Sequence, residues 1–156
     1  MVIFNPKTNK AMRKIITFTL ALFALTTFAN GRNEHDHIPY IAPMNLQNCN
    51  INNSQYVYAS SFSAGNSVVP NITHGNVTIK NGAVYEIEAS EDVLLGEGFI
   101  VENGATFAIK TPGKVTIDGC VFQCGANVKI EAGKVEVVKS FTAELGSKVE
   151  ITKFVD

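Results

Sequence analysis

The segment VTIKNGAVYEI at residues 77–87 recurs along the chain in related form. The copies, which align without gaps, are FIVENGATFAI at 99–109, CVFQCGANVKI at 120–130 and FTAELGSKVEI at 141–151. Their starts are separated by 22, 21 and 21 residues. This fixed period is too short for helical-hairpin repeats, and it predicts a stacked β architecture or solenoid.

The middle of each copy carries a glycine followed by a small residue. Glycine is free of the usual φ restriction, and the small neighbour leaves room beside it, so the pair predicts a sharp corner in every coil. The four corner glycines are Gly82, Gly104, Gly125 and Gly146.

On both sides of the corner, apolar residues alternate with polar or small ones. A period of two predicts strands whose apolar residues face inward. Before the corner, the outermost inward column is Val77, Phe99, Cys120 and Phe141; after it, the last column is Ile87, Ile109, Ile130 and Ile151. Further short apolar segments at 92–96, 113–117 and 133–137 predict a third strand in each coil.

These patterns predict an all-β fold: a short three-sided parallel β-solenoid of about four to five coils of 21–22 residues, spanning residues 56–156. A single coil cannot bury its own apolar face, so each inward column must pack against the coils above and below. We expect a right-handed winding, following the general preference of crossovers between parallel strands. The segment from Lys153 to Asp156 begins a further coil, which predicts an open strand edge available for self-association.

The N-terminus has the pattern of an export signal over residues 1–29. Four basic residues precede an uncharged apolar run at 15–25, and small residues near Ala29 predict cleavage after that position. The run is shorter than the roughly 20 residues of a membrane-spanning helix, so we expect no membrane span in the mature chain. Met12 is a candidate initiator beside Met1, because Met12-Arg13-Lys14 directly before the apolar run is a more usual signal start than an eleven-residue polar leader.

Residues 30–55 are rich in asparagine and contain Pro39 and Pro43, without sustained periodicity. This composition predicts a linker or an N-terminal flap. After cleavage at Ala29 the chain keeps nine basic and 14 acidic residues, a net charge of −5. An acidic chain of this kind does not match a nucleic-acid-binding protein. We expect secretion, or a location at the cell surface or in the periplasm of a Gram-negative bacterium.

The segment 56–109 carries a more specific resemblance. It contains Tyr58-Ala59-Ser60, Ala89-Ser90, Val93-Leu94-Leu95, Gly98-Phe99 and Gly104-Ala105-Thr106-Phe107. In these motifs it resembles the three-coathanger-stack modules of secreted and surface proteins of Bacteroidetes. The match covers about a third of the chain, and Ala105-Thr106 departs from the Gly-Ser that usually stands there. The resemblance implies a β-stack at the cell surface and supplies no catalytic residues.

Two groups of residues are candidates for chemistry. His35 and His37, beside Glu34 and Asp36, are of ligand types that a divalent metal accepts, and a structural site would need a further ligand from elsewhere, for example His74. Adjacent ligands on one linker chelate weakly, so a solvated linker explains them more simply and we expect no metal or other cofactor. Six carboxylates suggest an acid/base pair for sugar cleavage, although a solvated face accounts for them too; they are Glu86, Glu88, Glu91, Asp92, Glu97 and Glu102.

The three cysteines are predicted to be mainly structural. Cys120 and Cys124 lie about 13 Å apart on an extended strand, too far for a disulfide, and their columns make both small core residues. A bridge between Cys49 and Cys124 remains open if the flap crosses the corner.

Three functions follow from this sequence. The leading hypothesis is an exported, non-enzymatic structural or interaction module that contacts other surface proteins or glycans. The second is a carbohydrate-binding module whose contact residues are Tyr56, Tyr58, Phe62, His74 and the loop 63–75, because aromatic rings pack against sugar rings. A small secreted hydrolase is a remote third.

Overall fold

The computed structural model describes residues 42–155. The expected signal peptide, His35 and His37 therefore lie outside the described residues. Within the described range the regular secondary structure is entirely β. The strands are β1 (Met44–Leu46), β2 (Cys49–Ile51), β3 (Gln55–Ala59), β4 (Phe62–Ala64), β5 (Val77–Ile79), β6 (Val84–Ala89), β7 (Val93–Leu95), β8 (Phe99–Val101), β9 (Thr106–Asp118), β10 (Val121–Phe122), β11 (Asn127–Lys139), β12 (Thr142–Ala143) and β13 (Lys148–Lys153).

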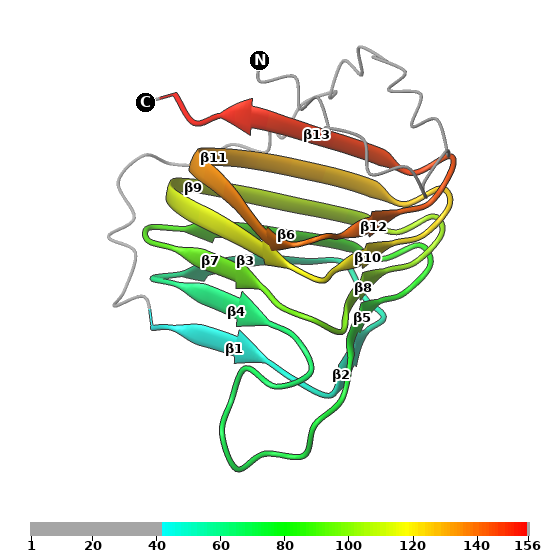
Figure 1. The fold of residues 1–156 in the computed structure, drawn as a ribbon, viewed down its shortest axis with the longest axis horizontal. Helices are drawn as coiled ribbons and strands as arrows, with labels where there is room; N and C mark the ends of the chain where they lie inside the picture. The colour runs from blue at the N-terminus through cyan, green and yellow to red at the C-terminus, as the bar shows by residue number, and fades with distance from the viewer. Residues whose placement is uncertain (1–41, 156) are drawn as a thin grey trace.

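The strands form a three-sided parallel β-solenoid, as the repeat predicts. Figure 1 shows the coils stacked from β1 at the bottom to β13 at the top. We call the sides the first face (β1, β4, β7 and the C-terminal halves of β9 and β11), the second face (β2, β5, β8, β10 and β12) and the third face (β3, β6, the N-terminal halves of β9 and β11, and β13). Each of the five coils, coil 1 to coil 5, contributes one strand segment to each face in that order.

The corner between the third and first faces differs from the prediction of three separate short strands per coil. β9 and β11 are continuous 13-residue strands that bend around this corner, so each supplies the third face of one coil and the first face of the next. In the earlier coils the same corner is a break, between β6 and β7 and between β3 and β4. The bend joins the first and third faces into one eight-stranded sheet.

The inward columns predicted from the repeat are confirmed by the strand register. Tyr85, Phe107, Val128 and Val149 follow one another from coil to coil, and so do Ile87, Ile109, Ile130 and Ile151. The rings of Tyr85 and Phe107 are stacked, with centroids 6.4 Å apart and planes at 10°. The core is therefore a set of ladders running along the solenoid axis.

Cys120 occupies its predicted place between two phenylalanines. Val121 pairs with Ile100 on one side and Thr142 on the other, which aligns Cys120 with Phe99 and Phe141. Cys120 is buried, and its thiol donates a hydrogen bond to the Leu95 carbonyl oxygen at 3.2 Å. A small residue here allows the polar Sγ atom to reach the main chain of the first face.

The glycine corner is also confirmed. Gly82, Gly104, Gly125 and Gly146 have φ between 74° and 92°, a left-handed conformation that side-chain-bearing residues rarely adopt. The residue before each glycine lies against the glycine of the next coil: Asn81 against Gly104, Asn103 against Gly125 and Cys124 against Gly146. The corner thus repeats in three dimensions as well as in sequence.

The solenoid begins earlier than the sequence predicted. β1 and β2 lie inside the expected linker or flap and pair in parallel with β4 and β5, so the first coil starts at Met44 rather than near Tyr56. Its corner is shorter than the others: Ile51 and Gln55 align with Ile79 and Tyr85, and no glycine lies between them. The shortened corner hid this coil from the gap-free alignment.

Candidate functional site

Tyr56 and Tyr58 project outward from β3 at the edge of the third face. Their rings meet edge to face with centroids 4.8 Å apart, and 47% of Tyr56 is exposed. The Tyr56 hydroxyl donates a hydrogen bond of 2.5 Å to Glu88 Oε2 on β6 in the next coil. This contact fixes the pair against the sheet, so the aromatic surface is held in place before any ligand arrives.

A groove of about 330 Å³ runs beside this pair, along the corner between the third and first faces. Its lining combines aromatic, apolar and charged side chains from several coils. The described residues that line it are Tyr58, Glu88, Ala89, Ser90, Lys110, Pro112 and Phe154.

The C-terminal end of the chain supplies one wall of the groove. The Phe154 N–H donates to the Ala132 carbonyl oxygen at 2.9 Å, which continues the ladder beyond β13. From there the Phe154 ring reaches down to Lys110, whose Nζ lies 5.6 Å from the ring centroid. This distance is within the range of a cation–π contact. Lys110 and Phe154 thus pack together although they belong to different coils.

The backbones of neighbouring coils pack closely at this corner. A Cβ atom added at Gly133 would overlap the Pro112 carbonyl oxygen, and one at Gly113 would lie 2.5 Å from the Glu91 carbonyl oxygen. The buried Thr111 secures the bend, because its Oγ1 donates to the Glu91 carbonyl at 2.5 Å and accepts from the Gly113 N–H at 3.0 Å. Side chains larger than hydrogen at these two glycines would push the neighbouring coils apart.

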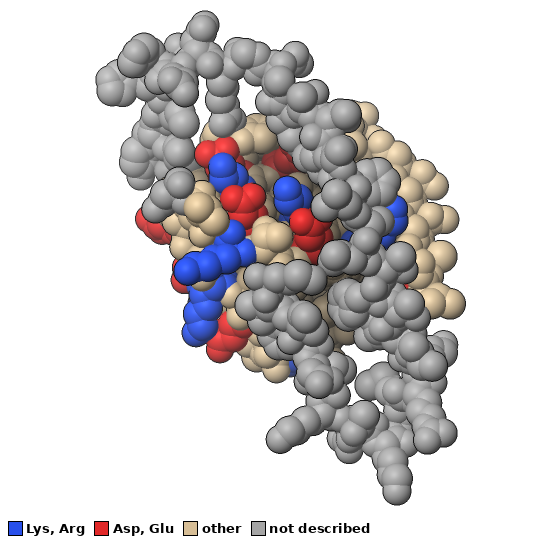
Figure 2. Space-filling model, turned by 90° about the horizontal axis from the view of Figure 1, so that it is seen from above, with Lys and Arg blue, Asp and Glu red and all other residues tan. Residues whose placement is uncertain are grey.

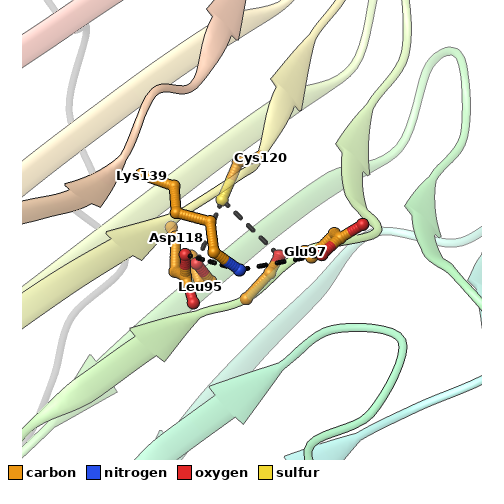
Figure 3. A network of polar contacts seen from close by, with 6 residues as sticks. Leu95, Glu97, Asp118, Cys120 and Lys139 are labelled. Atoms are coloured by element: carbon orange, nitrogen blue, oxygen red, sulfur yellow. Dashed lines mark hydrogen bonds and ion pairs between the residues drawn. The ribbon is translucent and has the colours of Figure 1, made fainter.

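A smaller pocket of about 220 Å³ lies elsewhere, at the start of the long loop that follows β4. Figure 3 shows Lys139 reaching between two carboxylates of this region. Its Nζ lies 3.4 Å from Asp118 Oδ1 and 3.8 Å from Glu97 Oε2. One ammonium therefore lies between two carboxylates, and we assign this pocket a structural role.

The contact surface predicted from the sequence is not assembled as expected. Phe62 is fully buried, because it faces inward from β4 in a column with Met44 and Val93. The predicted loop 63–75 begins two residues too early, since β4 extends through Ala64. His74 is exposed, but it lies on the loop between β4 and β5, which projects at the bottom of Figure 1, and it does not line the groove beside Tyr58. Of the contact residues predicted from the sequence, only Tyr56 and Tyr58 lie together on the outer side of the solenoid.

The sequence reasoning missed Lys110, Ser90 and Phe154 as groove residues. Phe154 follows the last repeat, where no further copy marked its position. Lys110 and Ser90 lie at the bend between faces, which the repeat alignment placed between copies. A signal was nevertheless present, since Pro112 and Gly113 interrupt an otherwise continuous strand pattern.

The carboxylates proposed for acid/base chemistry have separate surroundings, and Glu86 is buried. Glu88 is bound to Tyr56, Glu102 is paired with Lys80 at 2.7 Å, and Glu97 lies near Lys139. Burial raises the pKa of Glu86, whereas the hydrogen bond from Lys80 lowers the pKa of Glu102. These two acids belong to different faces of the solenoid, so their opposite shifts do not form an acid/base pair.

The cysteines are free thiols, so the bridge between Cys49 and Cys124 is not formed. Cys49 lies in coil 1 and Cys124 at the corner of coil 4. Cys124 is exposed rather than part of the core, because the residue before each corner glycine points along the outside of the coil. Burial raises the pKa of Cys120 to about 12.

The part of the chain that the structure describes contains no cluster of three or more metal-ligating His, Cys, Asp or Glu side chains. No apolar helix of bilayer-spanning length occurs in residues 42–155.

Comparison with protein-family models, with curated proteins and with solved structures finds no match to this chain.

Proposed function

We propose that this chain is an exported, non-catalytic interaction module at the surface or in the periplasm of a Gram-negative bacterium. The observation that carries the proposal is the outward-facing Tyr56–Tyr58 pair beside the corner groove, held on a stack of five coils. Aromatic side chains in fixed positions provide large contact area at low entropic cost. The basic, apolar N-terminal segment supports export, and the resemblance to three-coathanger-stack modules of Bacteroidetes supports a surface location.

The partners that suit this surface are other surface proteins or glycans, together with a second copy at the open C-terminal edge. A glycan ligand is the second candidate function, favoured by the groove itself. Tyr58 and Phe154 offer rings for the faces of sugars, while Glu88, Ser90 and Lys110 offer acceptors and donors for hydroxyl groups. Such a mixture of apolar walls and a few polar groups is typical of ligand sites.

Binding to intact cells tests the proposal. Fluorescently labelled chain is added to Bacteroidetes cells, and the expected result is saturable binding that falls at least tenfold in the Tyr56→Ala/Tyr58→Ala variant. Lys129→Ala is the matched control, because Lys129 is two register steps beyond Glu86, the neighbour of Tyr56, in the same outward column. Circular dichroism establishes that each variant is folded.

Pretreatment of the cells separates the two ligand classes. Loss of binding after proteinase treatment identifies a protein partner, whereas loss after periodate oxidation identifies a glycan. Equal binding by the tyrosine variant and the unmodified chain would contradict the assigned surface. Turnover of a glycan or peptide that is lost in Glu88→Gln would overturn the non-catalytic proposal.

A further inference from the structure

Both ends of the solenoid present unpaired strand edges among the described residues. On the second face the strand order runs from β2 to β12, and on the joined first and third faces β1 and β13 are terminal. Exposed edges of this kind pair readily with another chain unless something blocks them.

The backbone groups at the two edges are complementary. Thr142 and Glu144 donate their N–H groups to the carbonyl oxygens of Cys120 and Phe122, each at 2.9 Å. In a parallel strand the N–H and C=O of one residue face the same neighbour, so the alternate residues Phe141 and Ala143 direct theirs away from coil 4.

The other end shows the reverse pattern. The Cys49 N–H donates to the Asn76 carbonyl, and the Ile51 carbonyl accepts from the Lys80 N–H, so both residues face coil 2. Asn50 and Asn52 therefore direct their peptide groups outward. Along the register of the second face, Asn50 occupies the column of Thr78, Ile100, Val121 and Thr142. Coil 1 of a second copy laid on coil 5 would thus bring the Asn50 N–H to the Phe141 carbonyl, which repeats the bond between Thr142 and Cys120.

The inward columns continue across the same junction. In coil 5, Val137 is 37% exposed and Phe141 and Ile151 are only half-buried, because no coil of this chain covers them among the described residues. Their columns begin in coil 1 with Leu46, Cys49 and Val57. Cys49 of the second copy would meet Phe141, as Cys120 does within the chain.

The distribution of charged side chains favours coil 1 stacked on coil 5 over contact between two C-terminal ends. Coil 5 carries Lys134, Glu136, Lys139, Glu144, Lys148, Glu150 and Lys153, whereas residues 42–60 contain no charged side chain. Figure 2, which looks onto the end that bears β13, shows basic and acidic side chains interspersed there. Pairing two C-terminal ends would bring two charged coils together, while coil 1 brings no charge to the junction.

We propose that copies of this chain stack head to tail, with coil 1 of one copy on coil 5 of the next. The junction is heterologous and does not close on itself, so the product is an open filament of continuous β-solenoid. This inference deepens the self-association named in the proposed function. It does not depend on Tyr56 and Tyr58 binding a ligand, so either proposal can fail without the other.

Disulfide trapping between two tagged variants tests the junction. In a Cys49→Ala/Cys124→Ser background, Asn50→Cys is introduced into one tagged chain and Thr142→Cys into another. Both positions are exposed, and Cys120 is buried. Neighbouring strands lie about 4.8 Å apart, which is within the Cα separation of a disulfide. Under mild oxidation we expect the mixed disulfide to exceed either homodimer at least tenfold.

The control is Asn103→Cys, an exposed corner position in the middle of the solenoid. Cross-linking of the mixed pair no greater than that of the control would overturn the proposal, and so would a predominance of Thr142→Cys homodimers. Sedimentation velocity of the unmodified chain provides a second measurement. We expect species larger than a dimer to grow with concentration, and a single monomeric species at every concentration would contradict the filament.

Discussion

Asn103 of coil 3 lies directly against Gly125 of coil 4, so close that a Cβ atom at Gly125 would overlap Asn103 Oδ1. Gly125 also has a φ of 76°. Two independent constraints, backbone conformation and the approach of the neighbouring coil, therefore act on one residue. Gly82 has nearly the same φ, 79°, but an added Cβ would have nothing within 4 Å. This pair of glycines allows the two constraints to be measured separately.

Gly82→Ala should lower the free energy of unfolding by about 1 kcal/mol, the cost of a left-handed conformation for alanine. Gly125→Ala should lower it further, because Asn103 must also move. Adding Asn103→Ala to Gly125→Ala should return the loss to the Gly82→Ala value. Urea denaturation measures all three, and equal losses in the two single variants would show that contact between coils adds nothing.

The ladder of Phe99, Cys120 and Phe141 predicts a gradient of stability along the solenoid. Phe99 is fully buried, so Phe99→Ala should cost about 3–5 kcal/mol by the usual measure for a large cavity. Phe141→Ala should cost less than half as much, because Phe141 is half-buried at the open end. A cost for Phe141→Ala equal to that of Phe99→Ala would mean that the C-terminal end is as well covered as the interior.

The thiols should differ sharply in reactivity. Burial raises the pKa of Cys120 to about 12, while Cys124 is exposed. Because the thiolate is the reacting species, we expect Cys124 to be alkylated by iodoacetamide at pH 8 at least 100-fold faster than Cys120. Mass spectrometry of peptides at timed intervals measures both rates. Comparable rates in the folded chain would place Cys120 outside the core.

Glu102 and Glu86 should affect the pH dependence of stability in opposite directions. The hydrogen bond from Lys80 lowers the pKa of Glu102 below 4.5 in the folded state, so this contribution is present above pH 4.5 and is lost as the pH falls through the folded value. Burial raises the pKa of Glu86 above 4.5, so its stabilising contribution is instead present below pH 4.5 and is lost as the pH rises through the folded value.

Glu102→Gln should therefore reduce stability at pH 7 by about 0.5 kcal/mol, the size expected for a partly exposed pair, with a smaller effect near pH 3. Glu86→Gln should increase stability at pH 7. Denaturation at both pH values provides the measurement. A loss in Glu102→Gln that is the same at pH 3 as at pH 7 would attribute the effect to geometry instead of charge.

The repeat predicted most of the fold because packing between successive coils dictates the residue type in each column of the alignment. Gly125 and Ile130 occupy their predicted positions, since a corner and an inward ladder each demand a particular residue type. Coil 1 escaped prediction because its shortened corner, between Ile51 and Gln55, lacks the glycine that identified the others. The continuous bend of β9 likewise depends on contacts between coils, such as Thr111 with Glu91, which no local pattern records.

The candidate site was harder to predict than the fold. An aromatic residue such as Phe62 suits both a core and a binding surface. Only the side of β4 on which its side chain lies distinguishes the two, and that side faces the core. The groove brings Tyr58, Lys110 and Phe154 together from coils distant in sequence. Their proximity follows from the number of coils and from the path of the last residues, neither of which the aligned segments fix.

The stacking of coils on a common axis is tested most directly by a distance between the two ends of one ladder. Spin labels at Asn50→Cys and Thr142→Cys, in the Cys49→Ala/Cys124→Ser background, are separated by 92 residues but by only four coil spacings. At about 4.8 Å per spacing, pulsed electron resonance on doubly labelled chain diluted with unlabelled chain should give a narrow distribution near 19 Å, broadened by the label linkers. A broad distribution, or one centred beyond about twice that distance, would contradict the stacked solenoid.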